Sequence, residues 1–183
     1  FFEAATQNAR DAVTPDGDPL FKSVSEAIGD AMDINGVPVV LDDVVSAAAD
    51  YYTLDGEFTS MPWNTSSAVM FTNMSLLEEA GIMAIPETWG EINAACDAIM
   101  GLMDGPANCI TWPNHGWFQE QSVAQQGADL VNNGNGREAR ATEAYYNSEA
   151  MVAYVSWWKE LNDMGYYIYT GVQRDWGGTQ NAF

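Results

Sequence analysis

The chain has 183 residues, of which 47% are hydrophobic and 12% aromatic, and its net charge is -20 from 26 acidic and six basic residues. This charge excludes a nucleic-acid backbone or an anionic membrane surface as the main partner, and the apolar content excludes a disordered chain. The length fits one domain or pieces of two, and no apolar run is long enough to predict a membrane-spanning helix.

Short strands alternate with helices along the chain, without internal repeats. Turn and capping residues indicate where each element begins and ends. We expect strands near 1–4, 57–61, 67–72 and 108–112, and helices near 19–28, 75–80, 89–103, 117–126 and 148–163. This alternation predicts an α/β architecture.

Turn-forming residues organise the first part of the chain. Asp18 followed by Pro19 is typical of a helix start. Residues 30–41 are expected to be mostly loop, with a turn at Asn35-Gly36. A short alanine-rich helix should follow and continue to about Asp50, and Asp55-Gly56 then predicts a hairpin.

The stretch from Met61 to Gly81 changes element twice. Pro62 cannot lie in a central strand, and the small polar residues 64–67 precede an apolar run of strand length. A short helix should follow, capped by Ser75 and ended by Gly81. Hydroxyl and amide groups at such a corner favour binding of a polar small molecule.

The second half contains the clearest helices. Thr88 and Glu91 have the spacing of a capping box, and His115 is interpreted as a turn-forming residue before a helix that ends at Gly127. Asn147 or Ser148 should cap the last helix. The expected buried stripes are Ile92, Ala95, Cys96, Ile99 and Met103 on one helix, and Met151, Tyr154, Val155, Trp158 and Leu161 on the other.

Cys96 and Cys109 are too few for a zinc site. Two buried thiols and a disulfide between a helix and a strand are both consistent with their positions. Export from the cell would favour the disulfide.

No catalytic or cofactor-binding pattern is present. His115 is the single histidine, Ser66 lies in no nucleophile elbow, and no phosphate-binding glycine loop or metal-ligand set occurs. Aromatic residues instead flank polar turns, at Trp63, Trp112, Trp117 and 166–169. Aromatic faces beside hydrogen-bonding groups are typical of sites for polyols and sugars, although each ring alone is also consistent with ordinary core packing.

Several segments in order resemble the family 1 extracellular solute-binding proteins of ATP-driven (ABC) importers, most closely the sn-glycerol-3-phosphate-binding branch. Met61-Pro-Trp-Asn-Thr-Ser-Ser67 is similar to the family's Pro-Phe-Asn-Ser-Ser motif, and Pro86-Glu-Thr-Trp89 to its helix start. The other matching segments are Phe2 to Thr6, Tyr51 to Gly56, Asn73 to Gly81, Thr111 to Trp117, and Asn147 to Gly165.

The resemblance implies an α/β, periplasmic-binding-protein-like fold (type II, two-lobed), of which the chain would hold an incomplete portion of both lobes. Residues 1–61 would end the first lobe, 62–67 would form the hinge crossing, and 68–183 most of the second lobe. The implied ligand contacts are Glu3, Thr65, Ser66, Trp112 and Trp117. Thr65 and Trp63 depart from the family's Ser and Phe, the family's phosphate-binding Arg would lie beyond Phe183, and Arg174 is not a substitute for it.

The resemblance further implies a non-enzymatic, periplasmic and monomeric protein without cofactors. It would capture a small polyol, either sn-glycerol-3-phosphate or a glycerophosphodiester, and deliver it to the permease subunits of an ABC importer. A neutral sugar or oligosaccharide binder of the same fold is the alternative, and a carbohydrate-active enzyme with paired carboxylates is a remote one.

Overall fold

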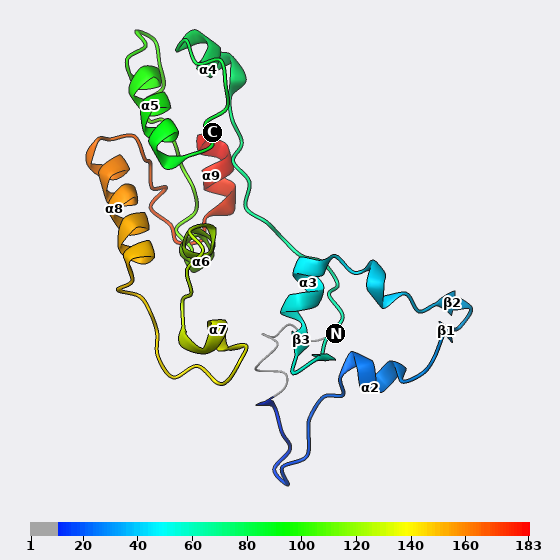
Figure 1. Ribbon diagram of the computed structural model, residues 1–183. Helices are drawn as coiled ribbons and strands as arrows, with labels where there is room; N and C mark the ends of the chain where they lie inside the picture. The colour runs from blue at the N-terminus through cyan, green and yellow to red at the C-terminus, as the bar shows by residue number, and fades with distance from the viewer. Residues whose placement is uncertain (1–10) are drawn as a thin grey trace. The chain divides into compact units, whose positions relative to one another are not determined.

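The computed structural model describes residues 11–183, so the predicted strand near 1–4 and the predicted contact Glu3 lie outside the described residues. The described chain divides into two compact units. The first unit comprises residues 11–67 together with 133–141, and the second comprises 68–132 together with 142–183. Figure 1 labels the helices and strands of both units.

The first unit consists of short elements joined by tight turns. β1 (Asp33–Ile34) pairs antiparallel with β2 (Val37–Pro38), and β3 (Thr53–Leu54) pairs antiparallel with β4 (Glu57–Phe58). Asn35 and Gly36 both have positive φ, as do Asp55 and Gly56, which confirms the two predicted turns. The elements are α2 (Val24–Ile28), β1 (Asp33–Ile34), β2 (Val37–Pro38), the 3-10 helix η1 (Leu41–Asp43), α3 (Ser46–Tyr51), β3 (Thr53–Leu54) and β4 (Glu57–Phe58).

The predicted helix start at Asp18 is wrong. The amide of Leu20 donates to Ala12 O at 2.9 Å, so this backbone closes a loop on itself and is not free to form a helical turn. Helix α2 begins only at Val24, where the Ser23 hydroxyl accepts from the Glu26 amide. α2 then packs on β4, because the Ser25 hydroxyl accepts from Phe58 N at 3.1 Å.

Two further expectations for this unit can be compared with the structure. Residues 30–41 are mostly loop and turn, as expected, although β1 and β2 form a short hairpin of two residues per strand within them. The strand expected over 57–61 is limited to Glu57–Phe58, although the Thr59 amide still donates to Tyr52 O at 2.8 Å.

The second unit is mainly helical. Its elements are α4 (Met74–Glu79), α5 (Trp89–Met100), α6 (Gly116–Gln125), α8 (Glu149–Asp163) and α9 (Trp176–Ala182), with α7 (Asn132–Gly136) at the border of the two units. α4 packs against α5, and α6 packs against α8. None of the helices within residues 11–183 is both long and apolar enough to cross a membrane.

Capping residues set the helix starts in the second unit. The capping box of Thr88 and Glu91 is confirmed, Ser148 caps α8, and the His115 side chain accepts from Trp117 N at 3.0 Å at the start of α6. The predicted cap Ser75 is wrong, because Asn73 accepts from Leu76 N instead. Either residue type suits the position, so composition alone does not choose between them.

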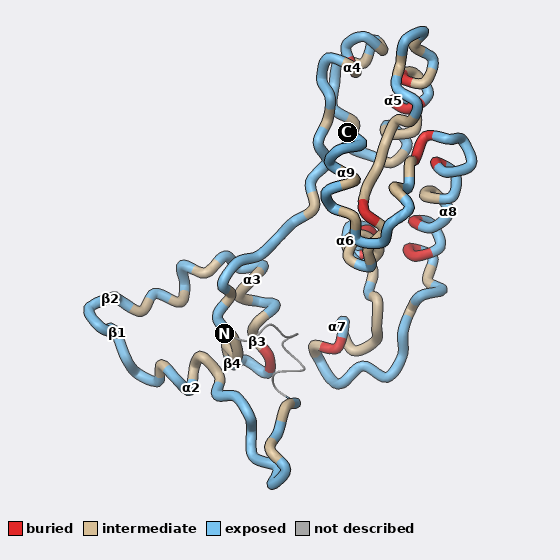
Figure 2. Tube along the Cα trace, turned by 180° about the vertical axis from the view of Figure 1, so that it is seen from behind, coloured by how far each residue is buried: buried red, intermediate tan, exposed pale blue. Residues whose placement is uncertain are grey.

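A disulfide lies at the centre of the second unit. Cys96 of α5 and Cys109 are joined by an S–S bond of 2.07 Å, which decides between the two interpretations of these cysteines. Cys96 packs with Leu161, Tyr166 and Tyr167 in one buried cluster. Figure 2 shows buried positions, drawn in red, along α5, α6 and α8. The bond therefore ties α5 to the segment that follows it.

Strand pairing in the described part of this unit consists of two isolated bridges, Ile110 with Tyr167 in parallel and Val131 with Ala144 antiparallel. Ile168 N also donates to Ile110 O at 3.1 Å. The predicted strand near 108–112 is therefore represented only by the bridge at Ile110. The predicted strand near 67–72 is wrong within the described chain. Phe71 there is 77% exposed, because no described strand lies beside it.

Candidate functional site

The first unit contains a cavity of about 420 Å³ around the end of α3. The rings of Tyr51 and Tyr52 meet edge to face there, with centroids 4.9 Å apart. Thr65 is exposed and lines the same cavity, whereas Ser66 is exposed but does not line it. The lining residues are Val45, Ala47, Ala48, Tyr51, Tyr52 and Thr65. An apolar wall with an accessible hydroxyl suits a ligand that presents both C–H and O–H groups.

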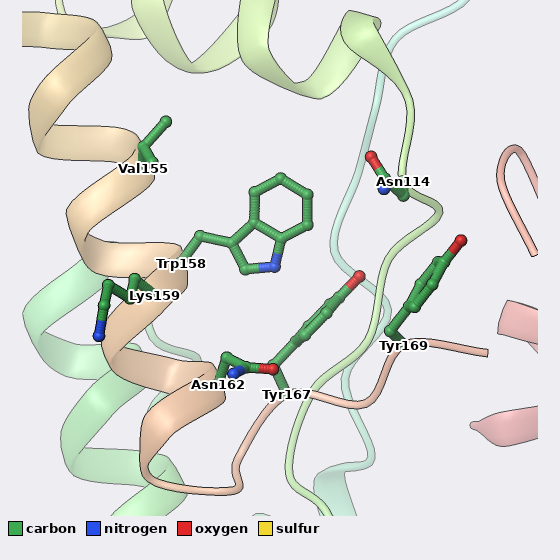
Figure 3. Close-up of a pocket in the computed structure, with 7 residues that line it drawn as sticks. All are labelled: Asn114, Val155, Trp158, Lys159, Asn162, Tyr167 and Tyr169. Atoms are coloured by element: carbon green, nitrogen blue, oxygen red, sulfur yellow. The ribbon is translucent and has the colours of Figure 1, made fainter. Parts of the chain in front are cut away.

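The second unit contains a cavity of about 310 Å³ between α8 and the segment after it. In Figure 3 the indole of Trp158 and the phenol rings of Tyr167 and Tyr169 border one space, with Asn114 and Asn162 beside it. The lining residues are Asn114, Val155, Trp158, Lys159, Asn162, Tyr167 and Tyr169. Aromatic faces combined with amide groups can hold a sugar or polyol ring.

Tyr167 supplies a neutral hydrogen-bonding wall to this second cavity. Burial raises the pKa of its phenol to about 12. Its hydroxyl donates to Trp112 O at 3.0 Å, so the ring is fixed in place from the segment 108–112. At neutral pH this wall therefore carries no charge, which suits an uncharged part of a ligand.

Trp112 is built into a stack of indoles. Its ring stacks on Trp157 with centroids 5.5 Å apart, and Trp157 stacks on Trp89 at 5.0 Å. The Trp157 Nε1–H donates to Asn93 at 2.8 Å, which fixes the middle ring. Tyr167 also packs against Trp112, with centroids 4.4 Å apart. Trp112 thus has a packing role in the second unit, and its predicted ligand contact stays a prediction.

Trp117 lies in a different aromatic group. Its ring packs against Phe118 and against Trp176 of α9, with centroids 6.0 and 6.1 Å apart. Thr65 and Ser66 belong to the first unit, whereas Trp112 and Trp117 belong to the second. In the first unit, Thr65 lines a cavity. In the second unit, Trp112 and Trp117 belong to separate aromatic groups.

Sequence reasoning did not assign several lining residues to a site, among them Trp158 and Asn114. Trp158 was assigned only to the buried stripe of α8, because helical spacing does not distinguish a core ring from a cavity wall. Asn114 carried no signal beyond its position between two tryptophans. Tyr167 and Tyr169, by contrast, belong to the aromatic run 166–169 that the sequence singled out.

The Tyr154 hydroxyl is a buried polar group near these rings. Burial raises the pKa of Tyr154 to about 12, and the nearby side chains of Trp112 and Ser122 lower it only in part. Its oxygen and the Trp112 Nε1 atom are both buried, and neither meets hydrogen-bond geometry with a partner within residues 11–183. A buried polar group without a partner destabilises the folded state.

We therefore expect Tyr154→Phe to leave the free energy of unfolding unchanged or to raise it by up to about 1 kcal/mol. The matched variant Tyr167→Phe removes a hydroxyl that does donate to Trp112 O. This variant should lower the free energy of unfolding by about 1 kcal/mol. Urea unfolding of both variants measures the difference. Equal losses in the two variants would contradict this account of Tyr154.

No group of three His, Cys, Asp or Glu side chains that could hold a metal ion occurs between residues 11 and 183. The two cavities are lined by aromatic rings, amides, the Thr65 hydroxyl and small apolar side chains, with Lys159 also at the second cavity.

Comparison with known proteins identifies the family. A profile described as bacterial extracellular solute-binding protein matches residues 3–183. The sn-glycerol-3-phosphate-binding periplasmic protein UgpB of Salmonella typhi is 28% identical over 157 residues, which cover 82% of this chain and 34% of that protein. The corresponding protein of Yersinia pestis is 26% identical over 132 residues, covering 69% of this chain and 30% of that protein.

The chain thus spans about a third of the length of these curated relatives. No solved structure matches it significantly. Since the family profile covers almost the whole chain, this protein belongs to the bacterial extracellular solute-binding proteins.

Proposed function

We propose that this chain is part of the ligand-capturing component of an ABC importer, and that its ligand is sn-glycerol-3-phosphate or a glycerophosphodiester. The observation that carries the proposal is the position of Thr65, predicted as a ligand contact, in the wall of the cavity formed with Tyr51 and Tyr52. The similarity to proteins named for binding sn-glycerol-3-phosphate supports the ligand class.

In this proposal the fold is the type II, two-lobed one, with 62–67 as a hinge crossing that lets the lobes close on the ligand. Glu3, Ser66, Trp112 and Trp117 would provide the other contacts, and permease subunits would accept the ligand without any chemical change to it. The disulfide supports an oxidising compartment such as the periplasm, because such bonds are rare in the cytosol.

Calorimetric titration with glycerol-3-phosphate, a glycerophosphodiester and maltose-type sugars tests the proposal. Thr65→Ala should weaken binding of the phosphorylated ligand by about 2- to 10-fold, because it removes one neutral hydrogen-bonding group. Ser75→Ala, which removes an exposed hydroxyl on α4 that lines neither cavity, is the matched control and should change nothing. Absence of heat with every ligand would contradict the proposed ligand class.

A neutral sugar or oligosaccharide is the second candidate ligand. The aromatic cavity of Trp158, Tyr167 and Tyr169 supports it, since ring faces pack well on the C–H faces of sugars. Heat of binding with maltose-type sugars that is lost in Tyr169→Ala would favour this candidate over the phosphorylated polyol.

A further inference from the structure

Negative charge covers the surface of this protein. The chain has 26 acidic and six basic residues, so one-to-one ion pairing can neutralise no more than six of the carboxylates. Within residues 11–183 every Asp and Glu is exposed except Asp175, which is half-buried. Lys22 pairs with Glu26 at 3.4 Å, and both side chains are exposed. Exposed pairs of this kind contribute little to stability, and most of the negative charge has no cation to compensate it.

Some of this charge lies at unfavourable helix ends. A helix has partial negative charge at its C-terminal end, where a cation stabilises it and a carboxylate destabilises it. Within residues 11–183 no helix has a basic residue in its last turn. Instead, α4 ends on Glu78 and Glu79, and Asp50 lies in the last turn of α3. Glu149, in the first turn of α8, is favourably placed but still adds to the net charge.

The first unit has little burial to set against the repulsion. Among residues 11–67 and 133–141, Leu54 is the one buried hydrophobic side chain. Asp42 and Asp43 lie next to each other in η1 of the same unit, and both are exposed. Repulsion between like charges destabilises a compact state. A small core therefore makes the stability of this unit sensitive to how far the repulsion is screened.

We propose that this protein is adapted to concentrated salt, and that its fold loses stability as the ionic strength falls. The distance over which exposed charges interact is about 8 Å at 0.15 M salt and about 3 Å at 1 M, so molar salt screens the carboxylates from one another and from the helix ends. A bacterial extracellular solute-binding protein meets the salt of its surroundings directly. The inference concerns the fold and does not depend on which ligand is bound.

Thermal unfolding of the whole chain in potassium chloride tests the proposal. Between about 0.05 M and about 2 M salt, the melting temperature should rise by about 5–10 °C, because screening removes repulsion that is present only in the compact state. A melting temperature that stays constant or falls as the salt is raised overturns the proposal.

Variants of equal size and different charge identify screening as the cause. Glu78→Gln combined with Glu79→Gln removes two carboxylates from the end of α4, and should raise the melting temperature at the lowest salt by about 2–4 °C. Gln125→Glu adds a carboxylate at the exposed end of α6, and should lower it by about 1–3 °C.

Both differences from the parent should shrink to less than about 1 °C at the highest salt. Both should persist in sucrose, which stabilises proteins by exclusion from their surface and screens no charge. Differences that stay at full size in concentrated salt would show that salt acts on this protein as sucrose does, and would overturn the proposal.

Discussion

Replacing both Cys96 and Cys109 by alanine is expected to lower the free energy of unfolding by about 3 kcal/mol. The two residues are 13 positions apart, so the bond closes a short loop in the unfolded chain and reduces its conformational entropy. Cys96 is 1% exposed and packs with Leu161, so the variant also leaves a small gap in the core. Urea unfolding of the oxidised parent and of the double variant measures the loss.

A reducing agent separates the bond from the packing. Dithiothreitol should lower the unfolding midpoint of the parent towards that of the double variant, and should leave the double variant itself unchanged. If reduction does not change the midpoint of the parent, the disulfide contributes nothing to stability, and the core alone holds α5 to the segment around Cys109.

Local rules explain why the helices of the second unit could be predicted. The capping box of Thr88 and Glu91 and the cap at Ser148 depend on residues within one turn, so the sequence contains all the information. Gly165, with φ of 74°, ends α8 for the same reason. By contrast, Asn73 and Ser75 are both good caps two positions apart, so capping preference alone does not choose between them.

Strand pairing could not be predicted in the same way. Residues 68–71 have the length and composition of a buried strand, but a strand forms only where a partner lies beside it. Within the described chain the backbone of Ala68 instead meets the side-chain amide of Gln121, with both distances 3.4 Å. The buried stripe predicted on α8 is confirmed at Met151, Tyr154 and Leu161. Val155 was expected in the same stripe, but it is 46% exposed and borders a cavity.

The residues of the candidate sites also divide into those that a local motif predicts and those that depend on long-range contacts. Thr65 was predicted as a ligand contact through its motif. The structure places it in a cavity wall, and the contact itself stays a prediction. The contact of Arg137 with the Tyr51 ring could not be predicted from sequence, because it joins residues 86 positions apart. Trp112 flanks a turn, which favoured a ligand role, yet its stacking on Trp157 is a long-range contact that no local pattern contains.

Leu161→Ala is expected to lower the free energy of unfolding by about 2–5 kcal/mol, the range for deleting a buried leucine side chain. Leu161 is 0% exposed and packs against Cys96, Tyr166 and Tyr167. Its carbonyl also accepts from the amide of Tyr166 at 2.8 Å, so the side chain and the backbone fix the end of α8 together. The relatively rigid surroundings of a disulfide should limit collapse of the cavity and place the loss in the upper part of that range.

Val152→Ala is the control on the same helix. Val152 is 53% exposed, and alanine has the higher helix propensity, so this variant should change the free energy of unfolding by no more than about 0.5 kcal/mol. Denaturant unfolding followed by tryptophan fluorescence reports directly on the indole stack beside Leu161. A loss below about 1 kcal/mol in Leu161→Ala would mean that the surrounding rings close the gap, and that the core around the disulfide is more adaptable than its packing indicates.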